Sequence, residues 1–315
     1  MVEKKIHVIL NPVSAAGSTG RRQAEILAAI KNRISRDFSL FITSRPHDAT
    51  VSAREAAISG SELLIVVGGD GTVQEVVNGL FDNKEPLNPR FQLGLISAGT
   101  GHGFAQSLGW PEDLGAQCDA IARGLVRRID IGRAEYSNGD GRLIERYFVN
   151  ECQAGIGGEV VKKVGTGQKK LGGFLAFGLV TLAAALRYPN RTITLSVDDG
   201  PATTGPFLGI VAANGHVMAG GMKLAPQAAV ADGRFDILLM HGQTLSERLR
   251  NFPKIYSGKH LASPKFSYFR GKSLSLASDE EVSFEADGEL FGRLPCRIEV
   301  LPGALKLRTD RPVKG

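Results

Sequence analysis

Short apolar runs alternate with segments of helical periodicity over the first third of the chain. Four runs have the length and composition of strands, at Lys5–Leu10, Ser39–Thr43, Leu63–Val67 and Gln92–Ile96. Apolar residues spaced three and four apart predict helices over Arg21–Ile34, Ala49–Ile58, Thr72–Leu80 and Phe104–Leu108. Strand and helix therefore alternate four times, which predicts a doubly wound parallel sheet in an α/β domain.

The pattern changes near Asp130. From Arg191 onward, short runs of alternating apolar and polar residues follow one another, separated by turn residues. They predict an antiparallel sheet, sandwich or barrel with strands at 192–197, 207–213, 234–240, 266–269, 273–277, 281–285 and 297–301. The chain thus divides into an α/β domain over residues 1–130 and a β-rich domain over residues 131–302.

The stretch Leu63–Leu80 joins a strand to a helix through a glycine turn, Gly-Gly-Asp-Gly-Thr at 68–72. Thr72 and Glu75 have the spacing of a capping box, so we expect them to form the helix start. A helix N-terminus after a glycine turn offers free amides and a positive dipole end to phosphate. A carboxylate beside phosphate calls for a cation, so Asp70 indicates a magnesium–nucleotide site. The alternative is an ordinary strand-to-helix turn.

Two further polar, glycine-bearing loops follow strands of the predicted sheet, at 11–18 and 97–103. Ligands of open parallel sheets lie beyond the carboxyl ends of the strands, where all three loops converge. Together they predict a nucleotide site more strongly than any one of them. The loop 11–18 is not a Walker loop, because no Gly-Lys-Ser/Thr ends it.

Composition narrows the classes of function. The 315 residues, 43% hydrophobic and 22% charged, are typical of a globular protein. The net charge of +6 comes without a dense Lys/Arg block, which argues against nucleic acid and suits an anionic membrane surface or substrate. Three cysteines, odd in number and far apart, favour a reducing compartment over a disulfide framework or zinc site. The N-terminal residues lack the long apolar core and cleavage site of a signal peptide.

The longest uncharged stretch is Leu171–Leu186, sixteen residues, which is short for a transmembrane helix. Its leucines and Phe174 form one apolar stripe, and lysines and Arg187 flank it. Two interpretations stay open. The stretch is a helix packed on the β-rich domain, or a lipid-facing surface helix whose basic flanks contact acidic headgroups.

Several motifs occur together in one known family. The chain has Asn11-Pro12, Gly-Gly-Asp-Gly-Thr at 68–72, Gly-Thr-Gly at 99–101, Asp130-Ile131-Gly132, Ala231-Asp232-Gly233 and Asp287-Gly288-Glu289. In this order, over essentially the whole chain, they resemble the diacylglycerol kinase catalytic-domain family, which holds bacterial lipid kinases and sphingosine kinases and is related to the NAD kinases. The resemblance implies a nucleotide-binding α/β domain and a C-terminal β-sandwich, with the active site in the cleft between them. It also implies a last strand, about 303–315, that returns to the first domain.

By resemblance, the chemistry is transfer of the γ-phosphoryl group of ATP to a lipid hydroxyl. The catalytic residues would be Asp70, Asp130, Asp287 and Glu289, with Glu289 as general base and Asp70 holding Mg²⁺ or a water in its shell. A structural Mg²⁺ would be held by Asp232 and the carbonyls of Ala229 and Arg234. Asp130, Asp232 and Glu289 could instead be ordinary turn residues. ATP would contact Asn11, Ser14, Thr43, Gly68, Gly69, Asp70, Gly71, Thr72, Gly99, Thr100 and Gly101.

The chain departs from the family pattern at two places. Bacterial lipid kinases usually continue Gly-Thr-Gly with Asn-Asp-Phe-Ala-Arg, whereas this chain has His102-Gly103 before Phe104. The carboxylate that joins the metal–water network is therefore replaced by Gly103, which would weaken metal binding or change how the acceptor headgroup is read. In the first loop, Ala15 stands where a glycine is usual.

The sequence thus predicts an ATP-dependent kinase of a diacylglycerol-like or sphingoid-like lipid, cytoplasmic and peripheral on the inner membrane face. Two alternatives stay open: a kinase of a soluble nucleotide or polyol, and a non-catalytic nucleotide- or lipid-binding regulator. The stretch 169–188 favours a lipid acceptor, and retention of Asp70, Asp287 and Glu289 favours catalysis. Nucleic acid is not an expected partner, and pairing of edge strands into a homodimer is left open.

Overall fold

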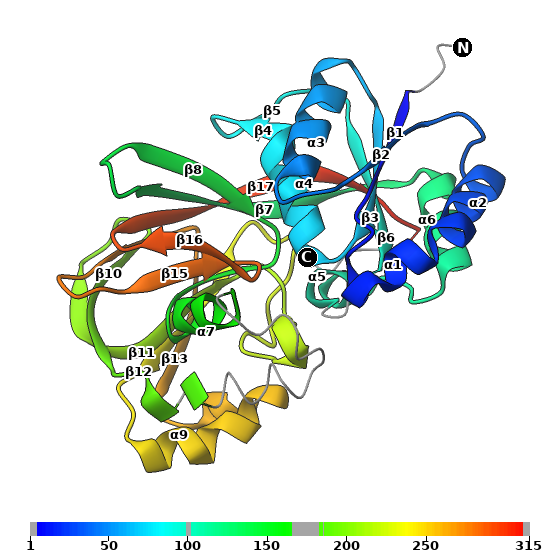
Figure 1. Ribbon diagram of the computed structural model, residues 1–315. Helices are drawn as coiled ribbons and strands as arrows, with labels where there is room; N and C mark the ends of the chain where they lie inside the picture. The colour runs from blue at the N-terminus through cyan, green and yellow to red at the C-terminus, as the bar shows by residue number, and fades with distance from the viewer. Residues whose placement is uncertain (1–4, 99–101, 166–182, 185, 311–315) are drawn as a thin grey trace. The chain divides into compact units, whose positions relative to one another are not determined.

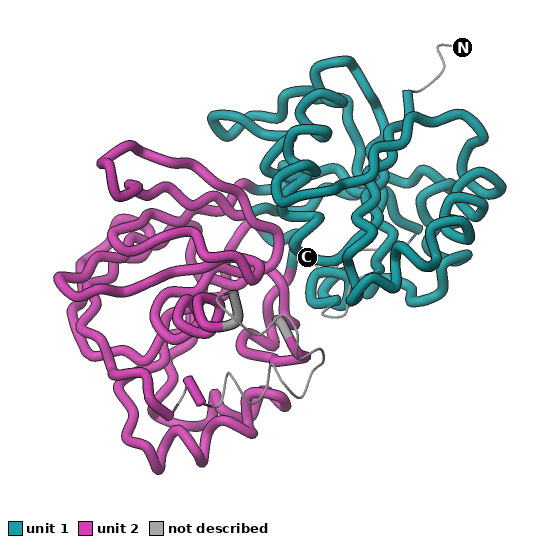
Figure 2. Tube along the Cα trace, in the orientation of Figure 1, with its two compact units in different colours: residues 1–131, 230–232, 302–315 teal, residues 132–229, 233–301 magenta. Residues whose placement is uncertain are grey.

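The computed structural model describes residues 5–98, 102–165, 183–184 and 186–310 (Figure 1). Contacts within the chain divide it into two compact units (Figure 2). Unit 1 comprises residues 1–131, 230–232 and 302–315, and unit 2 comprises residues 132–229 and 233–301. Two short segments from late in the chain are therefore part of unit 1.

Unit 1 is built on a parallel sheet in the order β17–β6–β3–β1–β2. Its strands are β1 (Ile6–Leu10), β2 (Ser39–Ile42), β3 (Leu63–Gly68), β6 (Gln92–Ser97) and the end of β17 (Cys296–Arg308). All six residues of β3 are buried, as expected for an apolar run with a strand on either side and helices on both faces. β17 joins the sheet beside β6 through the pairing of Leu307 with Leu93.

Helices cover both faces of this sheet (Figure 1). α3 and α4 contact each other and pack on β1 and β3, whereas α2 contacts α6, which packs on β6. The helices of unit 1 are α1 (Ser18–Arg21), α2 (Gln23–Arg33), α3 (Asp48–Ile58), α4 (Asp70–Leu80), α5 (Gly103–Ser107) and α6 (Leu114–Arg123). Three short elements complete it: the 3₁₀ turn η1 (Ala15–Gly17) and the hairpin β4 (Phe81–Asp82) and β5 (Glu85–Pro86).

The predicted capping box at the start of α4 is wrong. The helix begins at Asp70, its N-cap is Gly69, and no side chain caps it. Thr72 is instead engaged by the side chain of Asn11, and a carboxylate oxygen of Glu75 accepts the amide of Ala49 in α3, 3.3 Å away. Both side chains thus connect α4 to neighbouring segments.

Unit 2 is antiparallel. Its main path runs β16–β15–β9–β11–β10–β14–β17, while β12 pairs with β11 and β13, and β7 pairs with β8 and β17. The strands are β7 (Val126–Ser137), β8 (Leu143–Phe148), β9 (Glu151–Gly155), β10 (Arg191–Val197), β11 (Thr203–Ala213), β12 (Phe235–His241), β13 (Phe266–Gly271), β14 (Ser273–Ala277), β15 (Ser283–Ala286) and β16 (Glu289–Arg293).

The sheet of unit 2 is buried on both faces. Along β11, Ile210 and Ala212 join a core with Phe148, Phe235 and Phe284, while Val211 and Ala213 join a second cluster on the other side. The helical elements with described bounds in this unit are α7 (Ile156–Gly165), α9 (Leu245–Asn251), η2 (Ala219–Gly221), η3 (Phe252–Tyr256) and η4 (Lys259–Ala262). Because successive side chains of β11 point to opposite faces of the sheet, this one strand contributes to both cores.

The predicted fold class, a parallel α/β domain followed by an antiparallel β-domain, is confirmed. β9 and β16 were not predicted, because each has only five residues and begins with a glutamate, Glu151 or Glu289. Within the described part of the chain, no helix combines the length and apolarity needed to cross a membrane. The predicted apolar helix 169–188 lies largely outside the described residues.

Candidate functional site

In unit 1, loops after three parallel strands are tied together by hydrogen bonds. Asn11, which follows β1, donates from Nδ2 to Oγ1 of Thr72 at 2.9 Å. Ala98, which follows β6, donates its amide to the Gly68 carbonyl at 2.9 Å and accepts the Thr19 hydroxyl at 3.2 Å. The three loops that the sequence singled out therefore share one edge of the sheet, as parallel strands require.

The first loop has a strained backbone. Ala15 and Ala16 have φ of 51° and 52°, a left-handed conformation that costs a residue with a side chain about 1–2 kcal/mol. Ser14 turns inward, donating from its hydroxyl to the Asn11 carbonyl at 2.9 Å and lying 2.6 Å from the Thr19 hydroxyl. Strain of this kind persists where surrounding contacts fix the loop, often at a functional site. Thr19 is a member of this site that sequence reasoning missed.

Asp70 is the first residue of α4, and both of its carboxylate oxygens accept backbone amides. Oδ2 accepts Gly103 at 2.9 Å and Oδ1 accepts Phe104 at 3.4 Å. Burial raises the pKa of the Asp70 carboxyl, against these amides and the nearby His102, which lower it. A half-buried carboxylate at the site of three loops fits a role beside a cation, since Mg²⁺ is usually held by one or two carboxylates together with phosphates and water.

The rest of the predicted nucleotide set lies around this turn. A Cβ at Gly68 would come within 2.5 Å of Oγ1 of Thr72, so only glycine allows the contact between Thr72 and Asn11. Gly69 and Gly71 flank Asp70 in the chain, and Thr43 follows β2, where its amide bonds the Leu10 carbonyl at 3.0 Å. Three predicted members, Gly99, Thr100 and Gly101, lie outside the described residues.

The departure at His102-Gly103 has a visible consequence. His102 is the N-cap of α5 with φ of 47°, and its Nδ1 lies 2.7 Å from the hydroxyl of Ser97. Its successor Gly103 meets Asp70 through the backbone, as described above. Gly103, where the resemblance led us to expect an aspartate, thus contacts Asp70 through its backbone amide and adds no carboxylate.

Asp130 is buried where the chain crosses between its two units. Its amide donates to the Val230 carbonyl at 2.7 Å, and its Oδ1 accepts the amide of Gly303 at 2.7 Å. Asp130 thus ties β7 to both late segments of unit 1, through its backbone amide to Val230 and through its carboxylate to Gly303. This gives Asp130 a structural function besides the catalytic one that the family resemblance implies.

In unit 2, Asp287 is held by three backbone amides. Its Oδ2 accepts Val149 at 2.7 Å, and its Oδ1 accepts Asn150 at 2.9 Å and Glu151 at 3.0 Å. Asp287 itself has φ of 49° in the turn between β15 and β16. The carboxylate therefore clamps the β8–β9 connection to this turn, and Glu289 follows two residues later.

Glu289 begins β16 beside an arginine. Its Oε2 lies 3.0 Å from Nη2 of Arg146, whose guanidinium also sits 4.2 Å from the ring centre of Phe291. Among the described residues no hydrogen bond reaches the other oxygen, Oε1. Of the two acidic residues of this turn, Glu289 is thus the one with an oxygen available to a substrate.

Two buried glutamates beside this turn were not predicted. Glu285 and Glu151 are 2% and 3% exposed, and Glu285 accepts the amide of Gly288 at 2.9 Å. Gln153, opposite Glu285 in the β15–β9 pair, donates to Glu151. Burial, and then the nearby Glu151, raise the pKa of Glu285 well above its usual value. The signal in the sequence was a glutamate next to apolar residues in each of two short segments, 151–155 and 283–286.

The predicted structural metal set belongs to one chain segment before β12. Asp232 is half-buried, Ala229 is buried and Arg234 is exposed, and Gly233 between them has φ of 72°. Among the described residues, no three His, Cys, Asp or Glu side chains come together as metal ligands. A cation here would rely on backbone carbonyls, as the resemblance implied.

Comparisons with known proteins agree along the whole chain. The family model for the diacylglycerol kinase catalytic domain matches residues 5–134, and the model for the YegS C-terminal NAD kinase beta sandwich-like domain matches residues 150–309. A diacylglycerol kinase of Bacillus subtilis strain 168 is 31% identical over 295 residues, which cover 93% of this chain and 92% of that protein. A diacylglycerol kinase of Staphylococcus carnosus is 29% identical over 99% of this chain and 97% of its own.

Solved structures have the same fold. A diacylglycerol kinase structure from Bacillus anthracis str. Sterne superposes with a TM-score of 0.68 at 23% identity, covering 98% of each chain. An NAD kinase from Archaeoglobus fulgidus, solved in complex with ATP, has a TM-score of 0.52 at 12% identity over 97% of this chain and 94% of its own, a likeness of fold alone. With the fold, the turn at Asp70 and both halves of the sequence in agreement, the chain belongs to the diacylglycerol kinase catalytic-domain family.

Proposed function

We propose that this protein is an ATP-dependent lipid kinase that transfers the γ-phosphoryl group to a lipid hydroxyl. The observation that carries the proposal is the turn Gly68–Thr72, where a half-buried carboxylate lies at a helix N-terminus among three interlinked loops. Helix amides and a glycine turn suit phosphate oxygens, and the Asp70 carboxylate suits their cation. The named relatives, which are diacylglycerol kinases, support the same reaction class.

The residues of unit 1 take the nucleotide part of the reaction. Asn11, Ser14, Thr43 and the 68–72 turn, together with Gly99–Gly101, bind ATP, and Asp70 holds Mg²⁺ directly or through water. Mg²⁺ supplies neutralisation of the charge that develops on the phosphoryl oxygens. The protein's own contribution is positioning, because phosphoryl transfer requires little covalent chemistry from the enzyme.

The residues of unit 2 take the acceptor part. Glu289 receives the hydroxyl proton on Oε1 as the acceptor oxygen bonds to the γ-phosphorus and the bond to ADP breaks. Arg146 holds the other oxygen and so fixes the direction of the carboxylate. Asp287 fixes the turn that carries Glu289, and Asp130 extends the acidic set. Asp232, with the carbonyls of Ala229 and Arg234, holds a structural cation.

The acceptor is a diacylglycerol-like or sphingoid-like lipid, and the protein acts from the surface of the inner membrane leaflet. The names of the relatives favour diacylglycerol over a sphingoid base. An acceptor that stays in water, such as a nucleoside or polyol, is the competing case.

The direct measurement uses purified protein, labelled ATP and Mg²⁺ with separated lipid fractions, read by thin-layer chromatography and mass. We expect one lipid class to gain a phosphate, and Asp70→Asn to lower turnover by about 10²–10³-fold because it removes the charge beside the cation. Asp37→Asn, an exposed change in the same unit, is the matched control. Labelling of a soluble acceptor alone, or full activity of Asp70→Asn, would contradict the proposal.

A further inference from the structure

The short helix α9 in unit 2 buries polar side chains and exposes leucines, which is the reverse of an ordinary surface helix. Its buried side chains are polar: Arg248 is 9% exposed and Asn251 is 5% exposed. Two leucines one turn apart, Leu245 and Leu249, are 55% and 50% exposed. A surface helix normally turns its apolar residues inward and its charges outward, so this arrangement calls for a reason.

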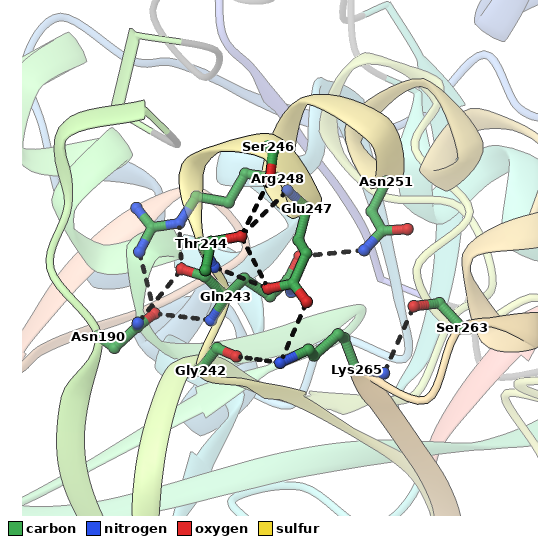
Figure 3. A network of polar contacts seen from close by, with 10 residues as sticks. All are labelled: Asn190, Gly242, Gln243, Thr244, Ser246, Glu247, Arg248, Asn251, Ser263 and Lys265. Atoms are coloured by element: carbon green, nitrogen blue, oxygen red, sulfur yellow. Dashed lines mark hydrogen bonds and ion pairs between the residues drawn. The ribbon is translucent and has the colours of Figure 1, made fainter.

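The inward polar face is stabilised by a dense network (Figure 3). The Arg248 guanidinium donates to the carbonyls of Tyr188 and Gln243 and, at 2.9 Å, to Oδ1 of Asn190. Asn251 donates to the side chain of Gln243 at 3.2 Å. These bonds satisfy the buried groups, so the helix is held with its leucine side outward.

The N-terminus of α9 is fixed as well. Thr244 and Glu247 form a complete capping box, and Glu247 also pairs with Lys265, 3.3 Å away. Lys265 in turn donates to the carbonyl of Gly242 at 3.2 Å. A rigid helix cannot rotate to bury its leucines, so their exposure is a built feature of the fold.

Charge around these leucines is strongly one-sided. Between Thr244 and Lys265 there are five Lys or Arg side chains and one acidic side chain, Glu247, a net +4 within a chain of net +6. Arg248 and Lys265 already form hydrogen bonds or an ion pair within unit 2, as described above. The three others have no ion pair among the described residues: exposed Arg250, half-buried Lys254 in η3 and exposed Lys259 in η4. α9 contacts η3, which contacts η4, so the three cations lie on adjoining elements.

We propose that this face, formed by Leu245, Leu249, Arg250, Lys254 and Lys259, docks the protein on an anionic lipid bilayer. Leucines on an exposed helix face insert at the headgroup boundary, and lysine and arginine beside them meet acidic headgroups. The inference adds a membrane-contact surface to the proposed lipid kinase and rests on that function only for the choice of a bilayer as partner. A second copy of the same chain is disfavoured, because each copy would bring the same uncompensated positive charge.

The test is co-sedimentation of the full chain with vesicles of phosphatidylcholine, alone or mixed with phosphatidylglycerol. We expect binding to the mixed vesicles that weakens with salt, and little binding to phosphatidylcholine alone. The triple change Arg250→Gln, Lys254→Gln and Lys259→Gln lowers the partition constant by about 100-fold, roughly five-fold for each cation. The pair Leu245→Ser and Leu249→Ser lowers it by about ten-fold, since each side chain is only partly buried on docking.

Matched controls carry the same chemical changes elsewhere. Lys31→Gln, Arg36→Gln and Arg90→Gln remove the same total charge from exposed sites of unit 1, and Ile58→Ser with Leu143→Ser replaces two other exposed apolar side chains. These controls are expected to bind like the wild type. Equal losses in controls and face variants would overturn the proposal, as would unchanged binding of the face variants.

Two further readouts separate this proposal from its competitors. If the leucine pair abolishes self-association measured by light scattering but leaves vesicle binding unchanged, the face is a contact between copies and the proposal is wrong. Turnover is measured separately with a short-chain, water-dispersed lipid acceptor. Vesicle binding without any turnover supports the docking face and counts only against the kinase function. Turnover together with vesicle binding that the face variants do not change supports the kinase function and counts against the docking face.

Discussion

Among the Asp-Gly pairs that follow strands in this molecule, those at 70–71 and 287–288 use the aspartate differently. In unit 1, Asp70 opens a helix and accepts two amides while burial raises its pKa. In unit 2, Asp287 accepts three amides from the β8–β9 connection. The same dipeptide thus places its carboxylate at a helix start in one unit and makes a backbone clamp in the other. In the proposed mechanism, Asp70 would stand beside the cation, and the residue after the second pair, Glu289, would take the chemical role in unit 2.

Substitution of Glu289 should give the largest effect. We expect Glu289→Gln to lower kcat by about 10²–10⁴-fold, because it removes the proton acceptor and keeps the shape of the side chain. Thermal unfolding should change little, since only one contact, with Arg146, is weakened. Activity is measured with the lipid acceptor and unfolding by circular dichroism. A loss of stability as large as that of an Asp287 variant would place Glu289 with the clamp instead.

Substitution of Asp287 should act on folding. Asp287→Ala leaves three backbone amides without their acceptor, and we expect unfolding free energy to fall by about 2–4 kcal/mol. Asp70→Asn, by contrast, should lower the unfolding free energy by only about 1 kcal/mol, because the side-chain amide keeps one acceptor oxygen for Gly103 and loses only the longer contact with Phe104. Denaturant titration of both variants measures the contrast. Equal destabilisation would erase the distinction between the two turns.

The buried pair Glu285 and Glu151 predicts a dependence on pH. Because the folded pKa of Glu285 is raised, the folded state binds the proton more tightly than the unfolded state, and stability falls as pH rises from the unfolded pKa to the folded one. Glu285→Gln keeps an acceptor for the Gly288 amide and does not titrate. Its melting temperature should therefore exceed that of the wild type by an amount that grows with pH.

Melting curves in a series of buffers test this, with Glu280→Gln, a surface glutamate whose pKa is lowered by Arg191, as the control. The control should be less stable than the wild type at neutral pH, the opposite sign. A wild-type advantage over Glu285→Gln that increases with pH would show that Glu285 is charged and paired.

The smallest effect concerns the first loop. Ala15→Gly relieves the strain of the left-handed backbone but raises the conformational entropy of the unfolded chain. The first effect is the larger, so we expect a net stabilisation of about 0.5 kcal/mol. Ala28→Gly, at an exposed position in the interior of α2, should instead destabilise by about 1 kcal/mol. Differential calorimetry of the two variants distinguishes strain from helix propensity. Destabilisation by Ala15→Gly would mean that the alanine methyl group makes a contact that outweighs the strain.

Patterns that depend on neighbours in sequence were predicted well. Five apolar residues before a glycine turn predicted a buried strand, and β3 lies in the middle of the sheet. The three polar loops were predicted to converge, and hydrogen bonds link them at one edge of the sheet. Prediction failed where a side chain could bond to more than one partner. Thr72 and Glu75 have the spacing of a capping box, but Thr72 bonds to the side chain of Asn11 and Glu75 bonds to an amide of α3. The amides that bind Asp287, and the strand β9 that pairs with Glu285, are far from these residues in the sequence, so no local pattern could predict the contacts.

The pairing of Leu307 with Leu93 has a consequence for how the protein is made. The part of β17 that pairs with β6 leaves the ribosome only after all of unit 2 has been synthesised. The β6 edge of the unit 1 sheet therefore stays without this partner strand while the second unit emerges and folds. Long-range closure of this kind slows folding and exposes a strand edge meanwhile. A nascent chain lacking residues 302–310 should accordingly be captured by chaperones more readily than a chain that includes them.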